Sequence, residues 1–248
     1  MNSATEGSFL ARKPGLGMFG LGAAAGLAAG LILGLVIHSN RTPPSGASPS
    51  ASALPEFPLA SGAHWTYQGK RRYQQGQQVK EMPLTVEVKV LEAVKGDNGV
   101  VLCEMEGCWD DAITDLALPS RYGLLLASGK LFRINAQDLP AAKQALTGEG
   151  AIPAEVFDRA ELLMEFPLRA GQRFGPPEQL CRSDGLYCWN VSPAPQAGQG
   201  AFALSLRTLP DEQTLVFRPG IGVLSWQYRH HGTLDEASLE LVEDRKDK

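Results

Sequence analysis

Apolar and polar side chains alternate along much of the C-terminal three-quarters of the chain, the period-two pattern of strands with one solvated face. The clearest case is Leu84–Val90, in which Leu and Val alternate with Thr, Glu and Lys. Ser128-Gly129-Lys130 separates two apolar runs and predicts a short hairpin. Residues 222–231 and 237–242 are also strand-like, with a turn predicted at Gly232-Thr233. This part of the chain is therefore predicted to be mainly β.

A helical pattern is confined to the middle of this region. Residues 140–146 and 153–159 each begin with proline, which suits the first turn of a helix because the backbone N–H is unpaired there. A small helical insertion among many antiparallel strands predicts an α+β or mainly-β domain.

One short motif, F-P-L-x-x-G-x-x-aromatic, occurs twice, at Phe57–Trp65 and at Phe166–Phe174. Proline withholds one strand hydrogen bond, glycine permits a turn, and the aromatic residue begins the next strand. Each copy is therefore predicted to be a corner that leads the chain into a sheet. We expect two sheet-forming halves around one core, and the alternative is a coincidence of common turn chemistry.

The N-terminal part of the chain predicts a membrane anchor. Residues 14–37 carry no formal charge, and about 20 apolar residues suffice to cross a bilayer as a helix. We predict an uncleaved transmembrane signal-anchor helix at 14–38. A cleaved signal peptide would have a shorter apolar core and a small-x-small site just after it. The nearest such site, Ala51-Ser52-Ala53, lies too far downstream.

The segments on either side of this helix complete the predicted organisation. The excess of basic residues before the helix favours a cytoplasmic N-terminus at 1–13. A Pro/Ser/Ala linker at 39–56 cannot bury a core and stiffens towards polyproline II. The exported β-rich domain is predicted at 57–243, and a charged tail at 244–248.

Four glycines recur at four-residue spacing within the predicted anchor, so they share one face of a helix. Such small-xxx-small faces allow close pairing of transmembrane helices, and the alternative is that a glycine-rich anchor produces the spacing by chance. The predicted helix-packing residues, through which the chain could self-associate, are Gly22, Gly26, Gly30 and Gly34.

The charge of the chain argues against nucleic acid as a partner. The formal net charge is −4, and Lys70-Arg71-Arg72 is the one basic run in the predicted domain. Phosphate binding needs clustered Lys and Arg, so no nucleic-acid partner is expected.

All four cysteines lie in the predicted exported domain, where an oxidising compartment would favour disulfides. We predict the pairs Cys103–Cys108 and Cys181–Cys188. The second pair flanks Asp184-Gly185, a preferred hairpin turn that would place the two cysteines opposite each other. Free thiols and a zinc site are the alternatives, although the spacings C-x4-C and C-x6-C do not match usual structural zinc sites.

Catalytic and metal signatures are weak throughout. His230 and His231 are neighbours on a predicted strand and so point to opposite faces. Asp110 and Asp111, in a predicted turn or short helix, show no convergent partner that general acid–base chemistry would need. No cofactor or metal site is predicted. The four tryptophans form a possible ligand face, although aromatic residues on strands are more often core: Trp65, Trp109, Trp189 and Trp226.

A family resemblance rests on the two ends of the predicted domain. The opening F-P-L-x-x-G-x-x-W-x-Y at Phe57–Tyr67 and the closing F-x-P-G-x-G at 217–222 resemble those of uncharacterised exported bacterial domains, which are often lipoproteins or membrane-tethered. The resemblance implies a curved antiparallel sheet, distantly similar to the half-barrel of periplasmic lipoprotein carriers. It supplies no catalytic residues.

These observations together predict a non-enzymatic cell-envelope protein, anchored in the membrane, that binds a partner protein as a scaffold. Its location is expected to be the bacterial inner membrane, with the domain facing the periplasm or the cell exterior. A domain that binds a lipid or another hydrophobic ligand is the first alternative. An envelope hydrolase with an unrecognised site is the second.

Overall fold

A computed structural model of the chain describes residues 57–96, 99–114, 118–148, 150–175 and 184–245. The predicted anchor, its four glycines, the linker and Cys181 lie outside these ranges. Within them, no helix has both the length and the apolar character needed to cross a bilayer.

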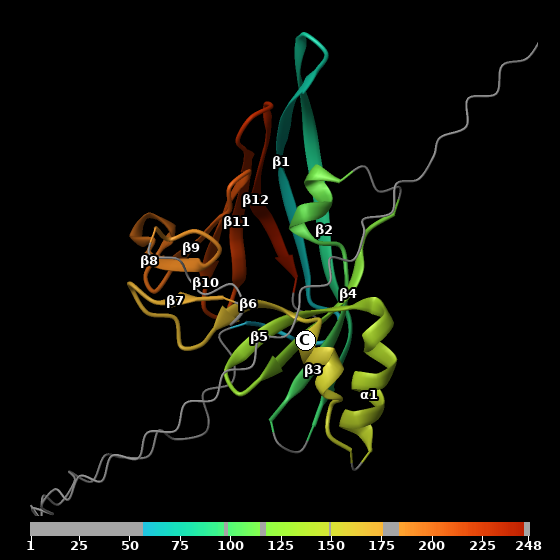
Figure 1. Cartoon of the computed structure of the whole chain (residues 1–248). Coiled ribbons are helices and arrows are strands. Elements are labelled where there is room, and N and C mark those ends of the chain that lie inside the picture. Colours follow the sequence, from blue (N-terminus) through green and yellow to red (C-terminus); the bar gives the residue numbers. More distant parts are fainter. Residues whose placement is uncertain (1–56, 97–98, 115–117, 149, 176–183, 246–248) are drawn as a thin grey trace, which may run out of the picture. The chain divides into compact units, whose positions relative to one another are not determined.

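The described residues form one antiparallel sheet of twelve strands (Figure 1). The strands are β1 (His64–Gln75), β2 (Gln78–Lys95), β3 (Val101–Glu106), β4 (Arg121–Ala127), β5 (Lys130–Asn135), β6 (Glu161–Glu165), β7 (Arg173–Phe174), β8 (Trp189–Pro193), β9 (Phe202–Arg207), β10 (Asp211–Arg218), β11 (Gly222–His230) and β12 (Asp235–Arg245). The helices are η1 (Trp109–Ile113), η2 (Ala136–Asp138), α1 (Leu139–Thr147), α2 (Ala154–Asp158) and η4 (Pro195–Ala197).

The predicted mainly-β fold with a small helical insertion is confirmed. The alternation at Leu84–Val90 lies in β2, where Val86, Val88 and Val90 are buried. The predicted hairpin joins β4 to β5, and both of its turn residues, Ser128 and Gly129, have positive φ.

Strand order shows that the sheet consists of two six-stranded halves. The order is β6-β5-β4-β3-β2-β1-β12-β11-β10-β9-β8-β7, so the halves join where β1 pairs with β12. Buried residues from both halves form one large core, because the sheet curls until it is nearly closed. The aromatic rings of Phe57 and Phe166 both lie against Phe217 in this core, with centroids 5.7 and 5.9 Å away.

The two copies of the F-P-L motif are equivalent corners, one leading into β1 and the other into β7. The N–H of Gly62 donates to Val90 O and the N–H of Val90 donates to Ala63 O, each at 2.9 Å. Gly171, Val191 and Gln172 repeat both hydrogen bonds at the same 2.9 Å. Gly62 and Gly171 have φ of 82° and 80°, a conformation that other residues adopt at a cost. The predicted corners and the two halves are therefore confirmed.

The outer surfaces of the two halves differ. Over the first half, Leu102, Leu125 and Ile134 face outward and pack under α1 and α2. Gly123 permits this contact, because a Cβ there would lie 2.6 Å from Ile134 Cγ1. Over the second half the outward positions are polar, among them Ser205, Thr214 and Gln227. This outer face is not covered by α1 or α2, whose apolar contacts lie on the first half.

The β1–β2 hairpin extends beyond the rest of the sheet (Figure 1). β3 pairs with β2 only from Lys89 onward, so the outer edge of β2 near the hairpin tip is not paired with β3. Pro83 lies opposite Lys70 along this stretch. A proline on an edge strand is tolerated because its missing N–H costs no ladder hydrogen bond there.

Candidate functional site

The four tryptophans predicted as a possible ligand face belong to the core. Trp65, Trp109, Trp189 and Trp226 are all buried, with relative exposures of 3, 7, 3 and 2%. The indole N–H of Trp65 donates to Ile221 O at 3.0 Å, so this side chain links β1 to the start of β11. The structure thus places these four residues in the interior and not on an open surface.

The described cysteines carry free thiols, so the predicted Cys103–Cys108 disulfide is not formed, and Cys181, the predicted partner of Cys188, lies outside the described residues. Cys103 lies within β3 and Cys108 follows the end of that strand, at the N-cap of η1. A strand rises about 3.3 Å per residue, so β3 carries the chain beyond the distance of about 7 Å that a disulfide can span.

Cys188 is also free, and its thiol lies 3.3 Å from Arg173 Nη2. The expected Asp184-Gly185 hairpin is absent from the described part of this segment. Residues 184–188 form turns instead, in which Asp184 Oδ1 accepts the N–H of Leu186.

Two polar regions are the candidate functional sites. The first is a groove of about 510 Å³ on the open outer face of β2, β1, β12, β11 and β10. We call it the outer groove. Its charged lining residues are Lys70, Arg72, Arg229, Glu81, Glu212 and Glu236.

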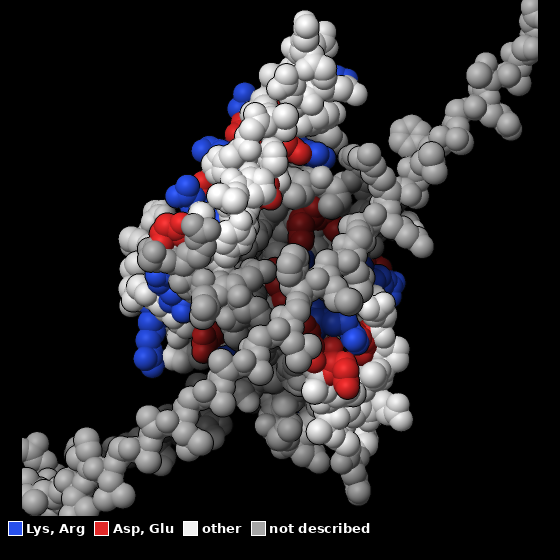
Figure 2. All heavy atoms as spheres, viewed as in Figure 1, with Lys and Arg blue, Asp and Glu red and all other residues white. Residues whose placement is uncertain are grey.

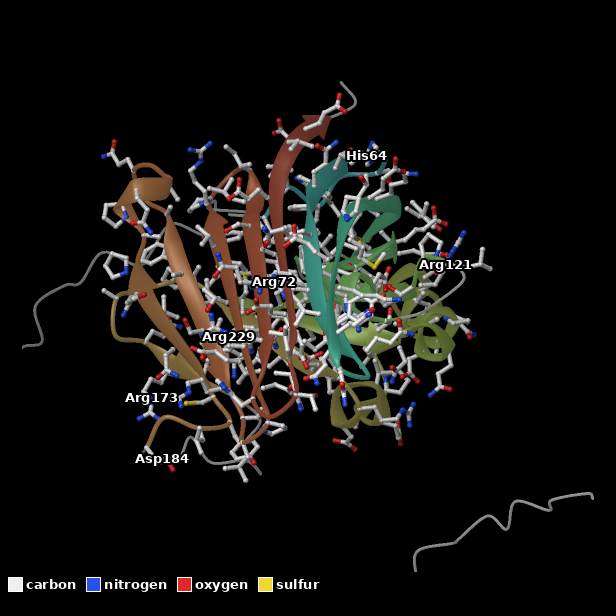
Figure 3. The ribbon with its side chains drawn as sticks, turned by 90° about the horizontal axis from the view of Figure 1, so that it is seen from above. His64, Arg72, Arg121, Arg173, Asp184 and Arg229 are labelled. Atoms are coloured by element: carbon white, nitrogen blue, oxygen red, sulfur yellow. The ribbon has the colours of Figure 1, made fainter. Side chains whose placement is uncertain are left out.

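Ion pairs connect most of the charges in the outer groove. Lys70 and Arg72 both pair with Glu81, at 3.2 and 3.6 Å. Arg72 also pairs with Glu236, and Arg229 lies 3.8 Å from the same carboxylate. Figure 3 shows Arg72 and Arg229 near each other, on the two strands that flank β12, with Arg121 far away on the side of the first half.

The second region consists of three adjoining hollows of about 400, 30 and 180 Å³ that share Asp110; the largest is lined by the first half, and the two smaller ones lie between the two halves of the sheet. We call it the inter-half cleft. Figure 2 shows acidic side chains in the middle of the molecule, between the two halves.

Arg133 is the central residue of this cleft. It lies opposite Leu124 in the β4–β5 ladder, so strand alternation directs it to the core-facing side of the sheet. A charge at such a position needs partners. Arg133 Nη1 lies 2.6 Å from Asp110 Oδ2, and Nη2 lies 2.6 Å from Glu161 Oε2.

Cys108 and Tyr122 complete this cluster. The Cys108 thiol donates a hydrogen bond to Asp110 Oδ1. Burial raises the pKa of Cys108, and the adjacent Asp110 carboxylate adds to this effect. Burial also raises the pKa of Tyr122, together with its neighbours Cys108 and Asp110. The Tyr122 hydroxyl is buried and forms no hydrogen bond of normal geometry.

Asp110 stays ionised despite its position. Burial acts to raise its pKa, but the charge of Arg133 and the hydrogen bonds from Arg133 and Cys108 lower it below the usual range. Asp111 has a separate, local role, because its Oδ2 accepts the N–H groups of Cys108 and Ser120 and so closes the loop around η1.

The opposite wall of the cleft contributes Asp211. Its Oδ1 accepts a hydrogen bond from the Tyr228 hydroxyl at 2.6 Å and lies 2.8 Å from His230 Nδ1. His231 lies 3.6 Å from Glu212 on the outer side, so the two histidines point apart as predicted. Within the described ranges, no group of three or more His, Cys, Asp or Glu side chains is arranged to hold a metal ion.

Sequence reasoning missed the convergence of Asp110 and Glu161 on Arg133. Their positions in the sequence are 23 and 28 residues from Arg133, and neither spacing is a motif. The one available signal was an arginine at a core-facing position of a predicted strand.

No protein-family model matches the chain, and no curated protein matches it. Two solved structures are similar to it. One is a protein of Bacteroides fragilis NCTC 9343, described as a predicted exported protein with a YmcC-like fold. It is 10% identical, with a TM-score of 0.35, over 77% of this chain and 98% of that chain.

The other is a predicted lipoprotein of Parabacteroides distasonis ATCC 8503. It is 9% identical, with a TM-score of 0.35, over 76% of this chain and 97% of that chain. The two descriptions, exported protein and lipoprotein, match the class of exported bacterial domains that the turn motifs resemble. Similarity at this level supports no inference about function, so the function is argued from the residues themselves.

Proposed function

We propose that the chain is a non-enzymatic, membrane-anchored protein of the cell envelope whose β domain binds a partner protein at the outer groove. The observation that supports the proposal is the open outer face on both sides of the junction between β1 and β12. α1 and α2 cover the outer face of β3, β4 and β5, whereas the outer face of β2, β1, β12, β11 and β10 is polar and contains the largest of the hollows described above.

The chemistry of the outer groove suits a protein partner. Three basic and three acidic side chains line it. Its ion pairs are partly exposed and contribute only about 0–1 kcal/mol each, so they can exchange for charges on a partner at little cost. Such charges determine the specificity and the association rate more than the affinity.

The alternatives have less support from the described residues. A lipid would need an apolar surface, but the walls of the outer groove are charged and the tryptophans are packed in the core. A hydrolase that uses two carboxylates would need one of them as a protonated acid. Arg133 instead holds Asp110 ionised.

Site-specific photocrosslinking in cells tests this proposal. A benzoylphenylalanine residue at Gln227, in the outer groove, should form a discrete adduct with one envelope protein. The same probe at Glu155, on α2, should not form this adduct. Arg229→Glu should weaken the adduct several-fold, because it reverses a charge in the groove, and Arg207→Glu on β9 makes the same change outside it. Equal adducts from both probe positions, or equal effects of the two substitutions, would count against the proposal.

A further inference from the structure

The inter-half cleft has features of a ligand site that the proposed function leaves unused. Its largest hollow is lined by residues of the first half, and its two smaller hollows reach β10 and β11 of the second half, whereas the outer groove lies on the outer face of β2, β1, β12, β11 and β10. Its largest hollow, about 400 Å³, falls within the range of small-molecule sites, about 300–1,000 Å³. We infer that this cleft binds a neutral, hydroxyl-rich molecule, that is, a saccharide.

The charged side chains of the cleft disfavour an anionic ligand. Arg121, Arg133 and Arg159 line the largest hollow together with three carboxylates. Each arginine already has an acidic partner: Arg133 pairs with Asp110 and Glu161, Arg159 with Asp138, and Arg121 with Glu104 and Glu106. An anion would therefore have to displace a carboxylate.

Cations are disfavoured for the complementary reason. Asp110 and Glu161 share Arg133, and Asp111 already accepts several hydrogen bonds from Cys108 and Ser120. A ligand without net charge leaves all of these pairs intact.

The carboxylates of the cleft can accept further hydrogen bonds from a ligand. The side chains of Asp110 and Glu161 are 40 and 41% exposed, and an ionised carboxylate offers about four lone-pair sites. They can therefore accept hydrogen bonds from additional O–H groups while keeping Arg133.

Tyr122 supplies the observation that points to a ligand. Its side chain is buried, its hydroxyl lies near Cys108 but forms no hydrogen bond of normal geometry, and the residue lines two of the three hollows. A buried polar group without a partner costs free energy, so a group that pairs with it on binding gains affinity. A sugar hydroxyl can both donate to and accept from a phenol.

The far end of the cleft adds an aromatic surface. Tyr228 is stacked on Trp226, with ring centroids 6.0 Å apart and planes within 10°. Asp211 and Gln213 lie beside them in the hollow of about 180 Å³. An aromatic ring next to planar polar groups can contact the C–H face of a sugar ring while hydrogen-bonding its edge.

Saturation-transfer NMR on the full chain tests the inference. The protein is held in lauryldimethylamine oxide, because glycosidic detergents would compete as sugars. The probes are D-glucose, N-acetyl-D-glucosamine and chitotetraose, the last of which distinguishes a free sugar from the end of a longer glycan. Sodium glutamate, phosphate and calcium chloride serve as charged competitors.

Tyr122→Phe is the decisive variant, and Tyr73→Phe in the β1–β2 hairpin is its matched control. Tyr122→Phe removes one hydroxyl without changing the core volume, so the melting temperature should be unchanged or higher. Sugar affinity should fall roughly tenfold, the loss expected for one hydrogen bond. Tyr73→Phe should bind as the unaltered chain does.

Three results would overturn the inference: no saturation transfer from any sugar, equal sugar binding by Tyr122→Phe and the unaltered chain, or displacement of the sugar by a charged competitor. Each of these leaves the outer groove untouched, because it shares no lining residue with the largest hollow of the cleft.

Discussion

Arg133 shows how a single residue can organise a region far larger than itself. Its guanidinium connects η1, β5 and β6 through Asp110 and Glu161. Sequence alternation predicts that Arg133 lies in a strand. It does not predict which residues pair with Arg133, because the curl of the sheet determines its partners. The same limit explains the cysteines, whose even number predicted disulfides that strand geometry does not permit at positions 103 and 108.

The thiols give a prediction at this scale. Burial raises the pKa of Cys103 to about 12 and also raises that of Cys108, so neither forms the reactive thiolate at pH 8. In the folded protein, iodoacetamide should leave both unmodified. In urea without reductant it should label all four cysteines.

Peptide mapping by mass spectrometry reads out each site. A disulfide-linked peptide containing Cys103 or Cys108 would contradict the structure. Rapid labelling of either thiol in the folded state would show that the core around η1 opens.

At the scale of elements, the agreement between sequence and structure is greatest where the signal is local. Period-two alternation, the turn residues at 128–129 and the prolines before the helices all predicted elements that the structure contains. The two F-P-L corners were predicted for the same reason, because proline, glycine and an aromatic residue each act within a few positions. The order of the strands depends on long-range pairing and could not be predicted from these signals.

Because the two corners have the same backbone conformation, the same substitution should destabilise both equally. Gly62→Ala and Gly171→Ala each force a side chain into a conformation with positive φ, which costs about 1–2 kcal/mol. The two substitutions should lower the free energy of unfolding by similar amounts in urea titrations. Gly150→Ala is the control, because that residue is exposed and a Cβ there would have no contact closer than 3.9 Å.

A large difference between the two corner variants would show that the corners are equivalent in geometry only. A loss in Gly150→Ala as large as in the corner variants would show that the effect reflects the removal of glycine in general and not the backbone conformation.

For the whole molecule, the sequence predicted two halves around one core, and the structure adds that the halves have different surfaces. The first half has apolar outward positions covered by α1 and α2, and the second has polar outward positions that continue onto β1 and β2 as the outer groove. Each side chain follows the alternation, but the reason for the asymmetry lies in the insertion between β5 and β6, which carries both α helices.

The predicted anchor belongs to this scale because it would set the number of domains in one assembly. If Gly22, Gly26, Gly30 and Gly34 form a pairing face, Gly26→Leu and Gly30→Leu should abolish a dimer trapped by crosslinking in membranes. Gly20→Leu places the same bulk off this face and should leave the dimer unchanged. A dimer that persists in all three variants would show that the glycine face is not what holds it together.

The ladder between β1 and β12 joins the two halves of the sheet. Each half is a six-stranded meander that begins after an F-P-L corner. The first strand of one half pairs with the last strand of the other. This ladder joins the first edge of one meander to the last edge of the other, and the remaining edges, β6 and β7, are not hydrogen-bonded to each other. The β1–β12 ladder is therefore the one hydrogen-bonded seam between the two meanders in the described residues, and it lies beneath the outer groove.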